Sequence, residues 1–220
     1  LPTILEAMEY FESAGLKYEV VVVDDGSSDD TVNCVNTLIA EKTTLRIIQL
    51  HKNRGKGAAV RTGVMSATGD FILYADADGA TPFRELEKLI NALSAGADIA
   101  IGSRAIHSSN AKVVTNIHRR YLGRIFNWAA NIAAVPQISD TQCGFKLFKK
   151  HAAKKIFSLQ CFDGFSFDVE VLFLAQKIGF RIKELAVNWN NKPGTKVNVV
   201  TDGFKMFIDL ILIKIRHRNL

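Results

Sequence analysis

Short apolar runs alternate with amphipathic segments through the first half of the chain. Runs of strand length occupy residues 20–23, 45–50, 71–75 and 98–101. Segments with helical spacing of apolar residues occupy 4–11, 32–39, 57–67 and 82–93. Continuous apolar runs are typical of strands that are buried on both faces of a parallel sheet. The alternation therefore predicts an α/β domain with a mostly parallel sheet and helices on both faces.

The second half of the chain has a different rhythm. Residues 113–135 form one long helical pattern, with apolar side chains on one side and Arg119, Arg120 and Arg124 on the other. Further helices are predicted over 167–178 and 203–215, and further strands over 145–148 and 180–187. We assign one domain to residues 1–200 and a C-terminal amphipathic, basic helix to residues 201–220.

Composition limits the class of protein. The chain has 220 residues, of which 48% are apolar and 23% charged, so it is long and apolar enough to form a folded core. No apolar run reaches the ~20 residues of a membrane span. The net charge of +6 suits anionic partners such as phosphorylated ligands or lipids, but it is modest for a nucleic-acid binder. Three cysteines without a Cys-x-x-Cys pair argue against a disulfide scaffold and a structural zinc site, and for a reducing compartment.

Paired acids follow two of the predicted strands. Asp24 and Asp25 follow the first strand, and Asp76 and Asp78 follow the third. Ligands of parallel sheets bind beyond the carboxyl ends of the strands, and carboxylates there suit a divalent cation such as Mg²⁺. The alternative is that aspartate and glycine simply end these strands. The two interpretations are equally supported at the first pair, whereas the metal is favoured at the second.

A third polar element lies at residues 53–61, where glycine, lysine and arginine stand at a predicted helix start. Such an element holds phosphates through backbone N–H groups and positive charge. It is not a P-loop, because Gly57 follows Lys56, and it lacks the dinucleotide fingerprint, because Val60 stands where the third glycine belongs. A flexible glycine turn is the alternative.

Together these elements resemble the GT-A glycosyltransferases of family 2. The motifs are Val-Asp-Asp-Gly-Ser at 23–27, Asn-x-Gly-Lys-Gly at 53–57, Asp-Ala-Asp-Gly at 76–79 and Gly-Ser-Arg at 102–104. Within that family, the segments 75–81, 140–148, 167–170 and 187–189 are similar to dolichyl-phosphate β-glucosyltransferases and their prokaryotic relatives. The resemblance implies a GT-A (Rossmann-like) fold over nearly the whole chain.

The resemblance also implies an activity and a set of site residues. The activity is inverting, metal-dependent transfer of a sugar, glucose from UDP-glucose, to a polyprenyl phosphate such as dolichyl phosphate. Another sugar or acceptor, or a nucleotide-sugar-binding fragment without turnover, is the alternative. The implied residues are Val23, Asp24, Asp25, Lys56, Asp76, Ala77 and Asp78 for the nucleotide sugar; Asp76 and Asp78 for Mg²⁺ or Mn²⁺; Asp76, Asp78 and Asp140 for catalysis; and Arg104, Arg119, Arg120, Arg124 and Glu170 for the acceptor.

An ionised lipid phosphate is already a nucleophile, so such a reaction needs positioning and charge neutralisation more than a general base. We therefore expect no catalytic histidine, and the five histidines show no metal-ligand spacing. The resemblance favours a membrane contact for the 113–135 helix over simple packing on the sheet. For the terminal helix, core packing and docking on a membrane or an oligomer partner are equally supported. The expected location is the cytoplasmic face of a membrane, that of the endoplasmic reticulum or a prokaryotic inner membrane.

One further expectation concerns the start of the chain. The resemblance places Leu1 and Pro2 at the family's first helix, after a first strand and a Pro-x-Tyr-Asn-Glu-like segment that help to hold the uracil. We expect an N-terminally incomplete domain, in which the strands at 18–23 and 71–75 lack the strand between them. Their unpaired backbone groups would then favour aggregation and weaken UDP binding and transfer.

Overall fold

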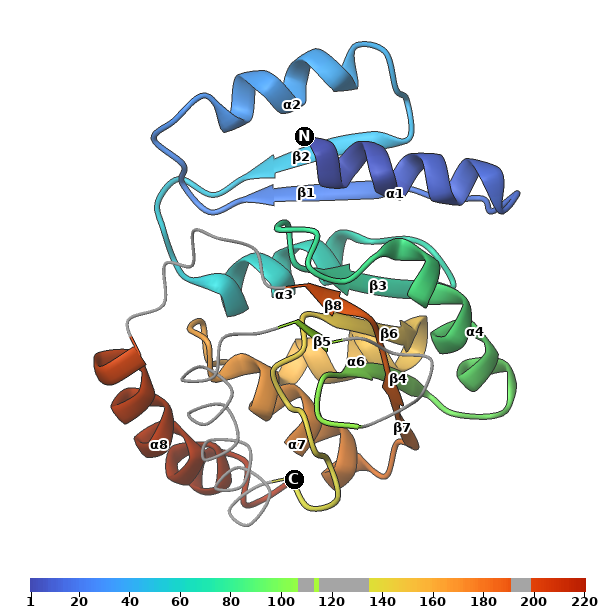
Figure 1. The fold of residues 1–220 in the computed structure, drawn as a ribbon. Coiled ribbons are helices and arrows are strands. Elements are labelled where there is room, and N and C mark those ends of the chain that lie inside the picture. Colours follow the sequence, from blue (N-terminus) through green and yellow to red (C-terminus); the bar gives the residue numbers. More distant parts are fainter. Residues whose placement is uncertain (107–112, 115–134, 191–198) are drawn as a thin grey trace.

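The computed structural model describes residues 1–106, 113–114, 135–190 and 199–220, with only the backbone course given for 199–204 and Val114. Figure 1 shows a small layer formed by the N-terminal elements above a larger sheet that is wrapped by helices. The two layers are described in turn because the strand ends of the larger one carry the candidate site.

The small layer contains the first four elements of the chain. They are α1 (Pro2–Ser13), β1 (Val20–Asp24), α2 (Thr31–Ile39) and β2 (Leu45–Gln49), of which α1 packs through Ala7 and Phe11 against a core of the larger sheet. β1 and β2 are parallel, and α2 packs on β2. The next helix, α3 (Lys56–Ser66), packs on β1 and also reaches β3, so it connects the two layers.

The larger sheet has the strand order β3 (Phe71–Ala75), β6 (Phe145–Lys149), β4 (Ile99–Ser103) and β7 (Ile182–Ala186). β6 runs antiparallel to both of its neighbours, while β4 and β7 are parallel. Side chains alternate between two cores. Ile99, Ile101 and Phe148 face one core, and Ala100 and Leu147 face the other.

Helices cover both faces of this sheet, as the sequence predicted. One core is formed with α6 (Lys150–Leu159) and α7 (Phe167–Ile178), and the other with α4 (Leu86–Ser94), which follows the short 3₁₀ turn η1 (Phe83–Glu85). The expected elements of the first half are all present. α6 was not predicted, although its buried residues, Ala152, Ala153, Ile156 and Phe157, do follow a helical pattern.

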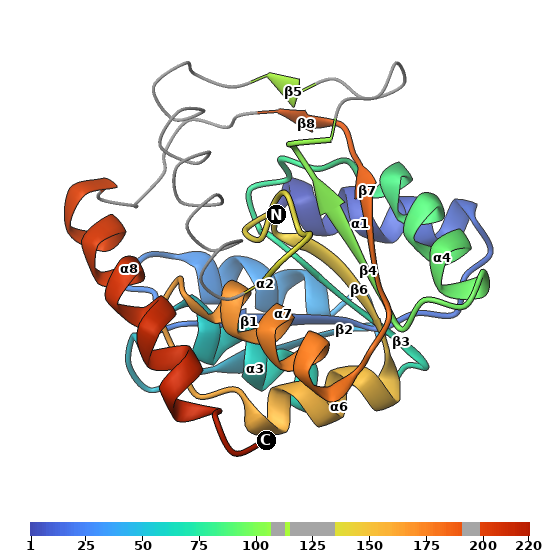
Figure 2. The same cartoon turned by 90° about the horizontal axis from the view of Figure 1, so that it is seen from below.

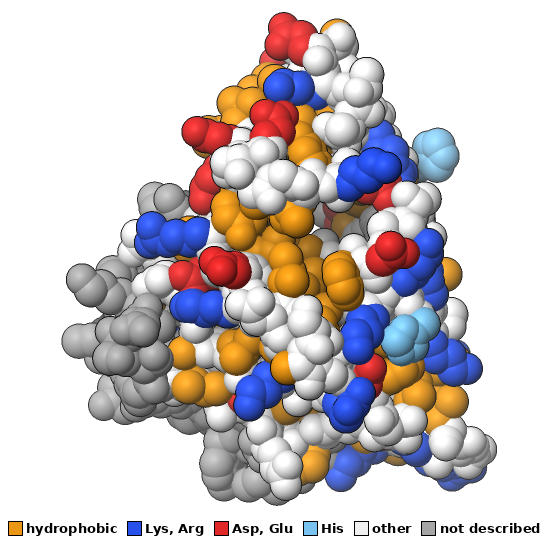
Figure 3. Space-filling view, turned by 90° about the vertical axis from the view of Figure 1, so that its right-hand side faces the viewer, with side chains coloured by type: hydrophobic (Ala, Val, Ile, Leu, Met, Phe, Trp, Pro, Cys, Tyr) orange, Lys and Arg blue, Asp and Glu red, His pale blue; other side chains and the backbone are white. Residues whose placement is uncertain are grey.

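The two layers are not joined by hydrogen bonds between strands. Among the described strands, β1 pairs only with β2, and β3 pairs at one edge, with β6. β1 and β3 therefore belong to separate sheets in the described structure, and the expectation of a missing strand between them stays a prediction. Phe71 at the start of β3 is 48% exposed. Seen from the side of α4, hydrophobic side chains gather in the middle of the surface, with charged side chains around them (Figure 3).

The structure corrects one prediction. The segment 113–135, expected to be one helix, begins instead with a strand, β5 (Val113–Val114). This strand pairs in parallel with β8 (Trp189–Asn190). Two adjacent valines fit a strand at least as well as a helix, and a distant extended segment decides between them. Figure 2 shows this small pair on the side opposite α6. Residues 115–134, with Arg119, Arg120 and Arg124, lie outside the described residues.

The C-terminal helix α8 (Val199–Arg216) starts earlier than predicted and has two apolar faces. Met206, Leu210 and Ile213 are buried in the core beside α7. Five other apolar side chains in the described part of the helix are exposed by 40–62%: Phe207, Ile208, Ile211, Leu212 and Ile215. Within the described part of the chain, no helix, α8 included, is both long enough and apolar enough to cross a membrane.

The two faces of α8 predict different effects of one substitution. Ile213→Ala, at 0% exposure, should lower the free energy of unfolding by about 2–5 kcal/mol, because it leaves a cavity. Ile211→Ala, at 62% exposure, should change it by less than about 0.5 kcal/mol. Urea unfolding of the two variants and the wild type measures both. Equal losses would mean that α8 is not packed through Ile213.

Candidate active site

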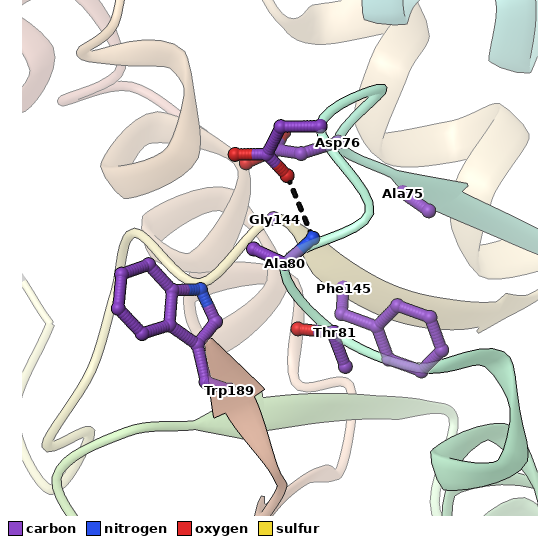
Figure 4. A pocket seen from close by; sticks show the side chains of 8 residues that line it. Ala75, Asp76, Ala80, Thr81, Gly144, Phe145 and Trp189 are labelled. Carbon is purple, nitrogen blue, oxygen red and sulfur yellow. Dashed lines mark hydrogen bonds between the residues drawn. The ribbon is translucent and has the colours of Figure 1, made fainter. Parts of the chain in front are cut away.

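The acids that follow β3 line a small pocket at the end of the sheet. Its walls are formed by Ala75, Asp76, Asp78, Ala80, Thr81, Gly144, Phe145 and Trp189. The backbone N–H of Asp76 donates to the carbonyl of Gly144 at 2.9 Å, and a Cβ atom on Gly144 would overlap the Asp76 carboxylate. A side chain at position 144 would therefore push the Asp76 carboxylate out of this position. Trp189 lies across the pocket from Asp76 (Figure 4).

The two carboxylates of this pocket are held differently. Asp78 uses Oδ1 to accept a hydrogen bond from the N–H of Ala80 at 2.9 Å, and its side chain is exposed. Asp76 forms an ion pair with Lys56, in which Oδ1 and Nζ are 2.7 Å apart. The backbone of Ala77 between them accepts a hydrogen bond from the Thr3 hydroxyl of α1. The strand end is thus fixed, while carboxylate oxygens face solvent.

Lys56 is the first residue of α3, and its charge is maintained by its neighbours. Burial lowers the pKa of its ammonium, but the nearby carboxylates of Asp76 and Asp168 outweigh that effect and raise the pKa above its ordinary value. The turn before it depends on Gly55, whose φ is +104°. At Gly57, the N–H donates to the Asp163 carbonyl at 2.7 Å, and a side chain would overlap the backbone of Phe162.

The first acid pair connects β1 to this turn. Asp25 accepts hydrogen bonds from the N–H groups of Arg54 and Gly55, both at 2.8 Å. Asp24 is buried and accepts from the N–H of Ser27. Val23 on the same strand lies against α3 at Gly63. The predicted nucleotide residues of β1 and of the 53–57 element therefore belong to one structural unit.

Arg104 and Asp140 form a bidentate ion pair beyond the end of β4, in which the Asp140 carboxylate is buried. Nε of Arg104 is 2.7 Å from Oδ2 of Asp140, and Nη2 is 2.8 Å from Oδ1. The guanidinium also lies over the ring of Trp189, 5.4 Å from its centre. Burial alone would raise the pKa of Asp140, but Arg104 outweighs it and lowers the pKa to about 2. The loop of Asp140 is held in turn by Glu184 of β7.

A buried polar network lies below these residues. Lys146 of β6 is fully buried and forms an ion pair with Asp168, which lies in the first turn of α7. Its ammonium also donates to the Tyr74 hydroxyl and to the Cys143 carbonyl, each at 2.7 Å, and the Tyr74 hydroxyl in turn donates to Asp168. Burial and the Asp168 carboxylate raise the pKa of Tyr74 well above its ordinary value.

The predicted site residues are only partly brought together. Lys56, Asp76, Arg104 and Asp140 are close enough for their charges to act on one another, and Asp78 shares the pocket of Asp76. The carboxylate of Glu170 instead contacts Cys161, Phe162 and His217. Sequence analysis missed Trp189 and the Lys146 network as parts of the site. A lysine inside the apolar run 145–148 was the available signal, because a buried charge requires a partner.

These contacts define what the site can bind. Carboxylate oxygens at a strand end, with that of Asp78 exposed, are the donor set that Mg²⁺ and Mn²⁺ prefer. Lys56 and Arg104 place positive charge close to Asp76, which suits phosphate oxygens. The residues present therefore fit a divalent cation together with a phosphorylated ligand.

The ion pair of Asp140 predicts a dependence of stability on pH. Its pKa is lowered from 3.8 to about 2, so its contribution is complete above its ordinary pKa and is lost as the pH falls through its folded value. Urea unfolding of the wild type and Asp140→Asn, at about pH 5 and about pH 2, should therefore show a difference that shrinks by about 2 kcal/mol. A constant difference would contradict the pairing.

Comparisons with known proteins agree with this geometry. The family model "Glycosyl transferase family 2" matches residues 1–157. Dolichyl-phosphate beta-glucosyltransferase of Saccharomyces cerevisiae is 39% identical over 94% of this chain and 67% of the relative, and that of Drosophila melanogaster is 40% identical over 99% and 71%. Glucosyl-3-phosphoglycerate synthase of Mycobacterium tuberculosis, solved with Mn²⁺ and UDP-glucose, is 15% identical, with a TM-score of 0.62 over 97% of this chain and 73% of that chain. That likeness supports the fold alone.

By its family model and its relatives, the chain belongs to glycosyl transferase family 2 and is a glycosyltransferase with a GT-A fold.

Proposed function

We propose that this glycosyltransferase transfers glucose from UDP-glucose to the phosphate group of dolichyl phosphate or another polyprenyl phosphate. The observation that carries the proposal is the end of β3, where Asp76 shares a pocket with Asp78, forms an ion pair with Lys56 and lies close enough to Arg104 for their charges to interact. The two relatives named above supply the sugar and the acceptor, since both bear the name dolichyl-phosphate beta-glucosyltransferase.

Asp76 and Asp78 would hold a divalent cation, Mg²⁺ or Mn²⁺, against the diphosphate of the nucleotide sugar. When bound, such an ion offsets the negative charge that develops on the leaving diphosphate. Asp78 offers the exposed carboxylate for this role. Asp76 is already positioned by Gly144 and by Lys56, so it needs little rearrangement.

Lys56 and the end of β1 would bind the rest of the nucleotide. The ammonium of Lys56 stays charged and reaches the diphosphate side of the pocket, where it adds a second positive charge. Asp25, with Val23 and Asp24, would contact the uridine, because the carboxylate of Asp25 holds the turn that leads directly into Lys56.

Arg104 would bind the acceptor phosphate. Asp140 and Trp189 hold its guanidinium from two sides, and this fixes the direction in which it presents positive charge. Asp140 acts through Arg104 and is a positioning residue. The low pKa of Asp140, about 2, keeps its carboxylate ionised. An ionised lipid phosphate needs no base to become a nucleophile. Glu170 stays outside this assignment because His217 and the loop at Cys161 occupy its carboxylate.

A lipid acceptor requires contact with a membrane, and α8 supplies a suitable surface. Its exposed apolar side chains stand next to the basic C-terminal residues Lys214, Arg216 and Arg218, a combination typical of helices that lie on anionic membranes. In the sequence, Arg119, Arg120 and Arg124 add charge of the same sign. We place the enzyme at the cytoplasmic face of a membrane.

The first test concerns the metal and the reaction. Asp78→Asn should lower transfer of labelled glucose from UDP-glucose to dolichyl phosphate by at least about 10- to 100-fold. Replacing a residue that only hydrogen-bonds a metal ligand already causes a loss of this size. Asp70→Asn is the matched control, because Asp70 is an exposed acid at the opposite end of β3. Circular dichroism should show all three proteins folded.

Three outcomes of that assay would overturn the proposal. Near-normal, EDTA-sensitive turnover of Asp78→Asn would remove Asp78 as a ligand. Transfer from another nucleotide sugar in a donor panel, or to another acceptor, would point to a different family 2 transferase. Binding of UDP-glucose without any turnover would point to a binding protein.

The second test concerns the membrane surface. Replacing Phe207, Ile211 and Ile215 with serine should lower binding to vesicles of anionic lipid by at least about tenfold. Full burial of one such side chain contributes about 1.5–3 kcal/mol, so partial burial of three in the membrane is sufficient for this loss. Serine at Leu5 and Leu16, which are exposed on α1 and just after it, is the control. Vesicle flotation measures both. Equal binding by both variants would exclude α8 as the docking surface.

A further inference from the structure

A second cluster of metal-ligating side chains lies away from the pocket, between α7 and the end of α8. Cys161, Glu170 and His217 place one ligand atom each within 4.8 Å of the others. Sγ of Cys161 is 3.1 Å from Oε1 of Glu170 and 3.8 Å from Nε2 of His217. The His217 nitrogen is 2.7 Å from the same Glu170 oxygen.

These distances are close to those of a metal centre. With bonds of about 2.3 Å to sulfur and about 2.0–2.1 Å to nitrogen and oxygen, tetrahedral ligands of Zn²⁺ lie about 3.3–3.6 Å apart. The observed separations of 2.7, 3.1 and 3.8 Å differ from these values by about 0.2–0.7 Å, a change that small rotations of the Cys161 and His217 side chains supply.

Two of the three side chains, Glu170 and His217, have contacts that a metal would not disturb. Glu170 is fully buried, and its Oε2 accepts the N–H of Phe162. The His217 ring lies against the ring of Phe173, and the His217 carbonyl accepts a hydrogen bond from Lys177 of α7. Glu170 and His217 are therefore held close to their ligand positions before any ion arrives.

The charges and the access of the cluster also suit an ion. A thiolate, a carboxylate and a neutral imidazole together carry two negative charges, which a divalent cation balances once the Arg216 guanidinium, which contacts the Cys161 thiol, moves aside. Cys161 is exposed, so the cluster opens to solvent on one side and leaves room for a water ligand. Thiolate and imidazole ligands favour Zn²⁺ over Mg²⁺, unlike the all-oxygen acids at the end of β3.

We propose that Cys161, Glu170 and His217 bind one Zn²⁺ ion, with water as the fourth ligand, and that this ion fastens the end of α8 to the core. On binding, the Cys161 thiol gives up its proton to solvent, and a neutral His217 carries its proton on Nδ1 so that Nε2 faces the metal. The site is separate from the pocket of Asp76 and does not depend on the proposed transfer reaction.

The spacing in the sequence hides this site. Cys161 and Glu170 are 9 residues apart, while His217 is 56 residues from Cys161. No short motif joins them, so the expectation of no structural zinc site, which rested on the absence of a Cys-x-x-Cys pair, did not test this arrangement.

The test is a titration of the full chain with Co²⁺, a spectroscopic substitute for Zn²⁺, in excess Mg²⁺. We expect a thiolate-to-cobalt charge-transfer band in the near ultraviolet that Zn²⁺ abolishes, and a rise in melting temperature when Zn²⁺ is added. Cys161→Ser should remove the band. His217→Gln should weaken metal binding by at least about 10- to 100-fold, since it removes a ligand rather than an outer partner.

Matched controls separate this site from adventitious binding. Cys34→Ser removes a thiol that donates a hydrogen bond to the carboxylate of Asp30. His151→Gln removes a surface histidine beside Asp98. Both should keep the band and the rise in melting temperature. Absence of a band in the wild type, its persistence in Cys161→Ser, or its loss in Cys34→Ser would overturn the proposal.

Discussion

The buried ion pair between Lys146 and Asp168 is the contact on which the site depends most. Lys146 lies on β6, between β3 and β4, so its charge lies inside the core. Removing one partner of such a pair costs about 3–5 kcal/mol, because the other charge is left buried without compensation. The ammonium is satisfied only when α7, the Tyr74 hydroxyl and the Cys143 carbonyl come together. The pair therefore fixes the start of α7 and the loop before β6 in one arrangement.

That arrangement explains how residues from distant segments form one site. The loop before β6 carries Gly144, which holds Asp76 at the end of β3, and it follows Asp140, which holds Arg104 at the end of β4. Asp168 also contributes to keeping Lys56 charged. A single buried network thus sets the positions of an acid that suits a cation and of two basic residues that suit phosphates. The chemistry of a glycosyltransferase rests here on preorganised charge.

The sequence predicted most of this fold because its signals are local. Strands such as Phe71–Ala75 are apolar runs that end at aspartate or glycine, and these patterns need no tertiary information. The acids of the pocket were found for the same reason. The strand β5 and the Cys161–Glu170–His217 cluster were missed, because each depends on segments far apart in the chain. On α8, the sequence left core packing and docking equally supported, because only the packed structure shows which apolar side chains are buried.

The central claim is that the acids at the end of β3 bind the nucleotide through a divalent cation. Calorimetric titration of the wild-type chain with UDP, in Mn²⁺ and then in EDTA, tests it directly. The account predicts heat of binding that is present with Mn²⁺ and largely lost in EDTA, and that returns when Mn²⁺ is restored. Equal UDP affinity with and without the cation would contradict it.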